Sequence, residues 1–336
     1  MRDNGKMRAW LMDSSNGVEN LRLAEVDTPS PGRGEVLLRI RFAALNPADA
    51  FLAKAMYPAK PSLPHILGRD GAGDVVAVGD GVDNVSLGHT AVILRCDAGV
   101  EKWGTLAEYT VVPAESVVPV PAGWSLEQAA AAPLVFLTAW QALTQWSAAP
   151  PQEGSVVLVT GASGGVGVAT VLLAKSMKLT VVALSRSAQK CEELKSLGAD
   201  FAFDPNDPNL RKSITAAIAP RKVDLAVDAV AGPLFNQVVA LLGYGGCISV
   251  LGRSGGTVPD FNTAMLFFKR NKIGGVAVGD FTPSTAKLAW DEIVRRLAEV
   301  GHQPVVDSVH MFEDVKTAFH KLDQGPMGKV LVRVTG

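Results

Sequence analysis

Residues 155–167 read Ser-Val-Val-Leu-Val-Thr-Gly-Ala-Ser-Gly-Gly-Val-Gly, and this stretch decides the fold class. Its first part, Val156–Val159, is an unbroken apolar run of strand length, and it leads into a glycine-rich turn. The segment Val166–Met177 that follows has the length and the apolar content of a buried helix. A buried strand that passes through a glycine turn into a helix is typical of a parallel α/β sheet.

The rest of the chain to about residue 278 continues the alternation of strands and helices, which predicts a parallel sheet buried on both faces. The expected strands are Val156–Val159, Thr180–Leu184, Phe201–Phe203, Asp224–Val230, Cys247–Leu251 and Lys272–Val278. The expected helices are Val166–Met177, Ala188–Leu197, Ile214–Ile218, Pro233–Leu242 and, beyond the sheet, Thr282–Val300 and Glu313–Leu322.

The segments on either side of this region have a β-rich texture. Short apolar runs such as Glu35–Ala44 alternate with Gly, Pro and Asp turns up to about Pro121, which indicates an antiparallel, barrel-like domain. A helical stretch from Ser125 to Leu143 follows, with Ser125 as its N-cap and Gln128 completing a capping box. We therefore predict one domain from residues 1–128 and 275–336, interrupted by a second from residues 129–274.

Composition excludes several classes of function. The 336 residues carry a formal net charge of -1, so there is no basic excess for nucleic acid or an anionic membrane. Three Cys residues cannot supply a zinc lobe with four thiolate ligands. Met1–Asp13 lacks the apolar core of a secretory signal, so the sequence predicts a cytoplasmic protein without a membrane span.

The glycine-rich turn predicts a dinucleotide site. Glycines let the chain turn tightly and let a pyrophosphate approach the peptide N–H groups, while the helix N-terminus adds partial positive charge. The alternative is a tight turn without a ligand. The residues expected to contact the cofactor here are Ala162, Ser163, Gly164, Gly165, Val166 and Gly167.

The end of the next strand predicts which dinucleotide is bound. An NAD site places an acidic residue about 20 residues after the turn, and there is none between Val168 and Cys191. Ser185, Arg186 and Lys190 stand there instead and suit the 2′-phosphate of NADP(H). A solvated basic loop is the alternative. The later strand ends add Ala229, Val230, Leu251, Gly252 and Arg253 as expected cofactor contacts, and Phe267 and Phe268 as either contacts or core residues.

Several motifs together resemble those of one enzyme superfamily. They are residues 44–49 (Ala-Leu-Asn-Pro-Ala-Asp), 67–73 (Leu-Gly-Arg-Asp-Gly-Ala-Gly), 104–109 (Gly-Thr-Leu-Ala-Glu-Tyr), 162–167 and 328–330 (Gly-Lys-Val). The chain resembles the medium-chain dehydrogenase/reductases, in particular the zinc-independent quinone oxidoreductases and the related enoyl and alkenal reductases. The resemblance implies a GroES-like β-barrel catalytic domain interrupted by a Rossmann domain. It also implies Thr138 and Lys329 as cofactor contacts, and a homodimer.

The same resemblance bears on zinc. Zinc-dependent relatives have a Cys at the position of Asn46, a His at the position of Arg69 and another Cys near Pro133. Asn and Arg supply neither a thiolate nor a neutral imidazole, so we expect no catalytic metal. A site without metal must polarise its carbonyl substrate with hydrogen-bond donors.

Three residues are the candidates for the chemistry. Asn46 is expected to donate to the substrate carbonyl. Tyr57 resembles the tyrosine that enoyl-thioester reductases use as a proton donor, and the alternative is a wall of the pocket. Arg69 either binds an anionic substrate or forms a structural ion pair with Asp70 or Asp49. The function expected is NADPH-dependent reduction of a quinone or an activated alkene, and the alternatives are an enoyl-thioester reductase and a non-catalytic NADPH-binding protein.

Overall fold

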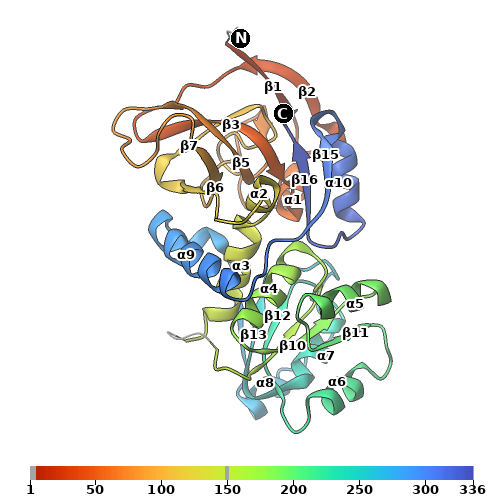
Figure 1. Cartoon of the computed structure of the whole chain (residues 1–336). Coiled ribbons are helices and arrows are strands. Elements are labelled where there is room, and N and C mark those ends of the chain that lie inside the picture. Colours follow the sequence, from red (N-terminus) through yellow and green to blue (C-terminus); the bar gives the residue numbers. More distant parts are fainter. Residues whose placement is uncertain (1–4, 148–150, 336) are drawn as a thin grey trace. The chain divides into compact units, whose positions relative to one another are not determined.

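A computed structural model describes residues 5–147 and 151–335 of the chain (Figure 1). Two structural units emerge, and neither is continuous in sequence. The first takes the chain up to Leu134, then Phe281–Trp290 and the residues from Gln303 on, and the second takes Val135–Asp280 and Asp291–His302. The proposed domains, residues 1–128 with 275–336 and residues 129–274, remain a proposal. Residues 1–4, 148–150 and 336 of these domains lie outside the described residues.

The second unit is built on a parallel sheet of six strands in the order β11-β10-β9-β12-β13-β14. Their bounds are β9 Val156–Val159, β10 Thr180–Leu184, β11 Phe201–Phe203, β12 Val223–Asp228, β13 Leu242–Val250 and β14 Lys272–Gly275. This is the doubly wound order, in which the chain reverses direction across the sheet between β9 and β12. The predicted Rossmann topology is confirmed. The last strand is shorter than predicted, and a 3₁₀ turn at Val278–Asp280 follows it.

Helices follow these strands and surround the sheet (Figure 1). They are α4 Gly165–Ser176, α5 Ala188–Ser196, α6 Leu210–Ile218, α7 Leu234–Leu241 and α8 Ala264–Lys269. The predicted helical stretch from Ser125 to Leu143 consists of two helices, α2 Leu126–Ala131 and α3 Pro133–Thr144. Proline has no N–H and clashes with the preceding turn, so it starts a new helix rather than continuing one. The capping box is confirmed, because Gln128 N donates to Ser125 Oγ (3.2 Å) and Ser125 N donates to Gln128 Oε1 (2.9 Å).

The first unit is β-rich. A seven-stranded sheet has the order β15-β16-β3-β5-β6-β8, with β7 paired to β3, and a three-stranded sheet has the order β2-β1-β4. The strands are β1 Lys6–Met12, β2 Arg22–Asp27, β3 Glu35–Ala44, β4 His65–Ile66, β5 Asp70–Val78, β6 Thr90–Ile93, β7 Tyr109–Pro113, β8 Val117–Pro119, β15 Val306–Met311 and β16 Lys329–Arg333. The GroES-like fold is confirmed, but the strand order does not close on itself, so the predicted barrel is an open arrangement of two sheets.

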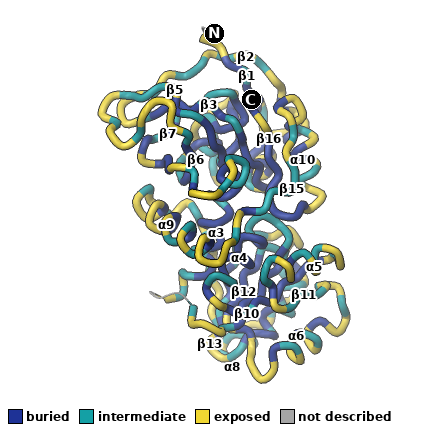
Figure 2. Tube along the Cα trace, viewed as in Figure 1, coloured by how far each residue is buried: buried dark blue, intermediate teal, exposed yellow. Residues whose placement is uncertain are grey.

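Helices α1 Pro47–Ala53, α9 Pro283–Glu299 and α10 Val315–Asp323 complete the regular structure, together with short 3₁₀ turns at Val18–Asn20, Ala114–Ser116 and Phe312–Asp314. Each unit has its own apolar core, and Figure 2 shows the central strands buried and the connecting loops exposed. Among the helices of residues 5–147 and 151–335, none has the length and apolarity that a membrane crossing requires.

Candidate active site

The end of strand β3 is flanked by buried charged residues from two other strands. Residue Ala44 is paired with Asp70 of β5 on one side and with Leu331 of β16 on the other. This register brings Asp70 and Lys329 next to Asn46, which follows β3 by two residues. All three side chains are buried, with residue exposures of 2 % for Asn46, 0 % for Asp70 and 4 % for Lys329.

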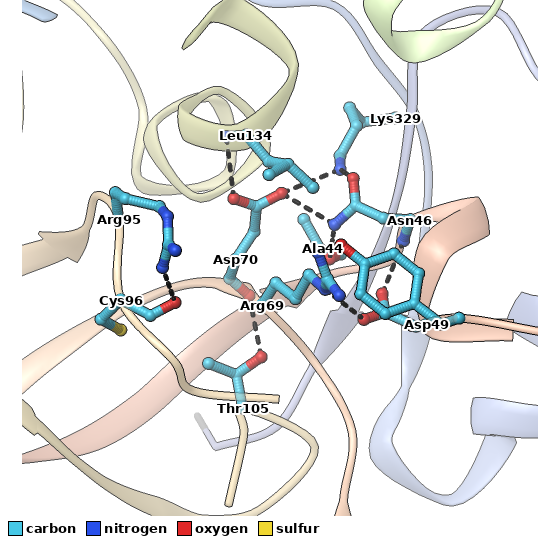
Figure 3. Close-up of polar contacts among 11 residues, drawn as sticks. Ala44, Asn46, Asp49, Arg69, Asp70, Arg95, Cys96, Thr105, Leu134 and Lys329 are labelled. Atoms are coloured by element: carbon cyan, nitrogen blue, oxygen red, sulfur yellow. Dashed lines mark hydrogen bonds and ion pairs between the residues drawn. The ribbon is translucent and has the colours of Figure 1, made fainter. Parts of the chain in front are cut away.

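These three side chains form a closed hydrogen-bond network, the Asn46–Asp70–Lys329 cluster (Figure 3). Lys329 Nζ donates to Asn46 Oδ1 at 2.6 Å and to Asp70 Oδ2 at 3.1 Å. Asn46 Nδ2 donates to Asp70 Oδ2 at 2.9 Å and to the carbonyl of Ala44 at 3.3 Å. The other carboxylate oxygen of Asp70 accepts the Leu134 N–H at 3.0 Å. The buried negative charge is therefore paired and its lone pairs are used.

The amide of Asn46 is fully engaged in this network. Both of its N–H donors and its carbonyl oxygen have partners within the protein. Donation from Asn46 to a substrate carbonyl, as the sequence predicts, therefore requires one of these bonds to open. The role of Asn46 remains a prediction. The predicted contact of Lys329 with the cofactor also remains a prediction, and here the ammonium group binds Asn46 and Asp70.

Arg69 and Tyr57 lie beside this cluster. Arg69 Nη1 donates to the Tyr57 hydroxyl at 3.0 Å, and the guanidinium carbon lies 4.3 Å from the centroid of the tyrosine ring. Arg69 Nε is 3.9 Å from Asp49 Oδ1, while Asp70 pairs with Lys329. Of the two carboxylates that the sequence offered as partners for Arg69, the structure therefore selects Asp49.

Asp49 is buried in the first turn of α1. Its Oδ2 accepts the Asn46 N–H at 2.8 Å, which is one half of a capping box. Burial raises the pKa of the Asp49 carboxyl to about 6, although the Arg69 charge acts in the opposite direction. Among the residues that the structure describes, buried Asp49 Oδ1 and Arg69 Nε and Nη2 have no hydrogen-bond partner. The 3.9 Å ion pair is thus the main interaction that compensates both charges.

The predicted dinucleotide loop lies at the carboxyl edge of the parallel sheet. Strand β9 ends at Val159, Gly161 has a φ of 57°, and α4 begins at Gly165 with Gly164 as its N-cap. A Cβ atom on Gly167 would lie 2.3 Å from the Gly161 carbonyl oxygen, so only glycine allows this helix to approach the strand. The first N–H groups of α4 have no partners within the helix and suit a pyrophosphate.

The residues expected at a 2′-phosphate lie after β10, which neighbours β9. Ser185 is 6 % exposed, Arg186 is exposed, and Lys190 belongs to the first turn of α5. Ser187 caps that helix by accepting the Lys190 N–H at 3.4 Å. Within residues 5–147 and 151–335, Arg186 has no acidic side chain in ion-pair contact. Its guanidinium is thus available for an anion.

The remaining expected cofactor contacts of this unit belong to the same sheet edge, with one exception on a helix. Ala229 and Val230 follow β12, and Leu251, Gly252 and Arg253 follow β13. Thr138 is half-buried within α3. Topology alone therefore gathers the strand-end residues at the point where Rossmann sheets bind ligands. Phe267 and Phe268 are 64 % and 75 % exposed, so the core role that the sequence left open for them is wrong.

Sequence reasoning missed a buried network at this edge. Asp228, the last residue of β12, is 0 % exposed. Its Oδ1 accepts the Thr160 hydroxyl at 2.5 Å and the N–H groups of Val230 and Ala231, each at 3.1 Å. Thr160 Oγ1 in turn accepts the Ala229 N–H at 3.1 Å. The network joins the loops after β9 and β12, and the signal for it was the Asp that directly follows the buried apolar residues Leu225–Val227.

The donor set does not fit a catalytic zinc ion. The positions where zinc-dependent relatives carry thiolate and imidazole ligands hold Asn46 and Arg69, which bind Lys329 and Tyr57. Across the part of the chain that the structure describes, no three His, Cys, Asp or Glu side chains come together as a metal site would require.

Comparison with known proteins gives the family. Residues 32–122 match the family model for the alcohol dehydrogenase GroES-like domain, and residues 165–299 match the model for zinc-binding dehydrogenases. A solved structure of an NAD-dependent alcohol dehydrogenase matches with a TM-score of 0.90 and 32 % identity over 98 % of this chain and 100 % of that one. The chain belongs to the medium-chain dehydrogenase/reductase superfamily.

Within this superfamily the chain belongs to the quinone oxidoreductase-like branch. It is 28 % identical to the quinone oxidoreductase of Rattus norvegicus over 97 % of both chains. It is 33 % identical to the chloroplastic NADPH-dependent alkenal/one oxidoreductase of Arabidopsis thaliana, over 73 % of this chain and 62 % of that protein. This dehydrogenase/reductase is thus an oxidoreductase, and its family uses a nicotinamide dinucleotide, NAD(P)(H).

Proposed function

We propose that this dehydrogenase/reductase reduces a quinone or an α,β-unsaturated carbonyl compound with NADPH and without zinc. The observation that carries the proposal is the set of hydrogen bonds that the Asn46 and Arg69 side chains make. Both positions are occupied by donors that hydrogen-bond within the protein, one to Lys329 and Asp70 and the other to Tyr57. The site thus holds fixed positive charge, and N–H groups of Arg69 that no described residue accepts, where zinc-dependent relatives hold a Lewis acid.

This donor set favours conjugated substrates. Reduction of a simple ketone generates an alkoxide, which needs a Lewis acid or a strong proton donor. Reduction of an enone or a quinone places the charge on a conjugated, less basic oxygen, which neutral donors can stabilise. When bound, a reduced nicotinamide supplies the hydride, and the protein's own residues then have to orient the substrate, exclude water and supply a proton.

NADPH is the proposed cofactor because of the residues after β10. Arg186 is exposed and has no acidic partner among the described residues, and the Ser185 hydroxyl lies one residue before it. A guanidinium binds a phosphate through paired, charge-assisted hydrogen bonds. The stretch that would carry an acidic partner for the ribose of NAD contains none between Val168 and Cys191.

Tyr57 is the proposed proton donor for alkene substrates. Its ring is packed against the core of the first unit, while its hydroxyl interacts with Arg69. A product with a new C–H bond at its α-carbon needs a proton delivered to carbon, whereas a hydroquinone oxygen takes its proton from water. We therefore expect Tyr57→Phe to lower turnover of a 2-alkenal by roughly 10²- to 10⁴-fold, and to affect a benzoquinone much less.

One experiment tests the proposal as a whole. NADPH oxidation is followed with purified protein against a benzoquinone, a 2-alkenal, an enoyl thioester and a saturated ketone. Turnover of the first two supports the proposal, and preferred turnover of the thioester selects the acyl-reductase alternative. Efficient reduction of the saturated ketone alone contradicts it. NADPH binding without turnover of any substrate points to a non-catalytic binding protein.

We also propose a homodimer formed through the edge of the parallel sheet. Strand β14 is the last strand of the sheet order, and Ile273 on it is 40 % exposed. Phe267 and Phe268 on α8, just before β14, expose 64 % and 75 % of their surfaces, and their ring centroids lie 4.4 Å apart. An open strand edge beside exposed aromatic side chains favours self-association. Light scattering at micromolar concentration tests it, and a monomeric mass contradicts it.

A further inference from the structure

Arg69 lies against the face of Tyr57 and also donates a hydrogen bond to its hydroxyl. The distance from Arg69 Nη1 to Tyr57 Oη is 3.0 Å. A guanidinium has donors and no acceptor. The tyrosine oxygen is therefore the acceptor in this bond, and the phenol hydrogen has to point to a different acceptor. The contact thus limits the directions in which Tyr57 can donate its proton.

The guanidinium itself is held in place. The Arg69 side chain is 9 % exposed, and its Nε lies 3.9 Å from Asp49 Oδ1, whose side chain is 0 % exposed. Asp49 is fixed in turn by the Asn46 N–H, which donates to its Oδ2 at 2.8 Å. A continuous set of contacts therefore runs from the first turn of α1 through Arg69 to the Tyr57 hydroxyl.

We propose that Arg69 is the positioning residue for proton transfer from Tyr57. By stacking on the ring and occupying the oxygen, Arg69 holds the phenol so that its hydrogen is directed to the substrate. This inference rests on the proposed function, in which Tyr57 protonates carbon. It makes Arg69 a determinant of specificity that matters more for alkene substrates than for quinones.

Reduction of a 2-alkenal passes through an enolate. The hydride that NADPH supplies brings both electrons and forms the C–H bond at the β-carbon, so the alkenal is reduced and the nicotinamide is oxidised. The alkene π pair moves to the α-carbon and carbonyl oxygen as an enolate. The Tyr57 O–H bond then breaks, its proton bonds to the α-carbon, and water returns a proton to the tyrosine oxygen.

Arg69 contributes at both ends of this transfer. Before it, the Nη1–H donor orients the hydroxyl. After it, the same donor faces a charged oxygen, and the hydrogen bond becomes charge-assisted on both sides, which strengthens it. Lysine at this position would keep the positive charge but lose the planar group that stacks and donates in a fixed direction. Arg69→Lys therefore separates charge from geometry.

The test compares Arg69→Gln, Arg69→Lys, Tyr57→Phe and the double variant Tyr57→Phe/Arg69→Gln with the wild-type protein. kcat and KM are measured with NADPH for a 2-alkenal and for a benzoquinone, together with the solvent deuterium isotope effect on kcat. Arg333→Gln is the matched control, because the Arg333 guanidinium stacks 5.4 Å from the centroid of Phe42, a ring without a hydroxyl. Thermal unfolding of each variant shows that it is folded.

The expected result is a selective loss. Arg69→Gln should lower kcat for the alkenal by about 10- to 100-fold, part of what general acid catalysis supplies, and raise its solvent isotope effect. KM for the alkenal should stay within about threefold of wild type, and kcat for the quinone should fall much less than kcat for the alkenal. Arg69→Lys should lose alkenal turnover as well. In the Tyr57→Phe background, Arg69→Gln should cause no further loss, because both residues act in one step.

Three results would contradict the positioning role of Arg69. An equal loss for both substrates, or an additive loss in the double variant, overturns the positioning role. So does normal alkenal turnover in a folded Arg69→Lys or Arg69→Gln variant while Tyr57→Phe is impaired. If Arg69→Gln does not fold, Arg69→Lys, which keeps a cation beside Asp49, decides alone. Wild-type protein that turns over neither substrate contradicts the proposed function itself.

Discussion

Lys329 Nζ lies 3.1 Å from Asp70 Oδ2 although the two residues are 259 positions apart in the sequence. Their side chains are 5 % and 1 % exposed, so this is a buried ion pair. Asn46 completes it by accepting from Lys329 and donating to Asp70. Buried pairs of this kind contribute little net stability as a whole, but loss of one partner leaves an uncompensated charge in the core.

Lys329→Met should therefore destabilise the protein strongly. The variant leaves the Asp70 carboxylate buried without its counter-charge, which costs about 3–5 kcal/mol in free energy of unfolding. Urea denaturation measures it. The control is Lys6→Met, which breaks the exposed Lys6–Asp27 pair in the same unit (side chains 54 % and 85 % exposed) and should cost about 0–1 kcal/mol. Similar losses of unfolding free energy in the two variants would show that removing Lys329 from its pair with Asp70 costs no more than breaking an exposed pair.

Arg186→Ala should weaken NADPH binding far more than NADH binding. A charge-assisted contact with the 2′-phosphate is worth about 1.5–3 kcal/mol, or about ten- to a hundredfold in Kd. Titration calorimetry with both cofactors checks this. Lys195→Ala is the control, because Lys195 lies at the other end of α5, where it pairs with Glu192 at 2.8 Å, and it should leave both affinities unchanged. Equal losses of NADPH and NADH affinity in Arg186→Ala would remove Arg186 from the phosphate site.

Thr160→Val should weaken NADPH and NADH equally and also lower stability. The Thr160 hydroxyl donates to Asp228 and accepts the Ala229 N–H, so its removal leaves buried polar groups unsatisfied, at about 1–3 kcal/mol. Denaturation and cofactor titration are the measurements. Thr170→Val is the matched control, since the Thr170 hydroxyl donates to the Val166 carbonyl of its own helix at 2.7 Å. Unchanged cofactor affinity in a destabilised Thr160→Val would limit this network to a structural role.

Asp49 should make stability fall as pH rises. Its carboxyl pKa is raised by burial from an ordinary value of 3.8 to about 6. Between these values the folded protein holds a proton that the unfolded chain has released, so the free energy of unfolding decreases with increasing pH. Relative to Asp49→Asn, wild-type stability should drop by about 3 kcal/mol from about pH 4 to pH 6 and then stay level. A difference that is flat or rises with pH would contradict it.

Local sequence was sufficient for some elements of the second unit, although it missed helix α8 and placed the start of β13 at Cys247 instead of Leu242. Strands β9, β10 and β11 have the predicted bounds because each is a short apolar run bounded by a turn, and helix α5 ends one residue before its predicted end. The sequence contains a reason for the break between α2 and α3, because Pro133 disfavours a continuous helix. The break was not predicted, because the residues on both sides of Pro133 are apolar.

The partners of the buried polar side chains in the first unit could not be predicted from local sequence. The sequence left open whether Arg69 pairs with Asp70 or Asp49, because Asp70 is its chain neighbour and Asp49 is near in sequence. The outcome depends on Lys329, which reaches Asp70 from the far end of the chain. Asn46 was expected to donate to the substrate because its partners within the protein, Asp70 and Lys329, are far from it in the sequence.

The sequence by itself determined the alternation of strand and helix, the glycine loop at residues 161–167 and the absence of an acidic residue after it, because these are properties of neighbouring residues. Only the tertiary structure decided which charges meet. The pairing of β3 with β5 and β16 sets the distances among Asn46, Asp70 and Lys329, and that register is a property of three strands at once. Side chains this deeply buried must find polar partners, and only the assembled sheet specifies them.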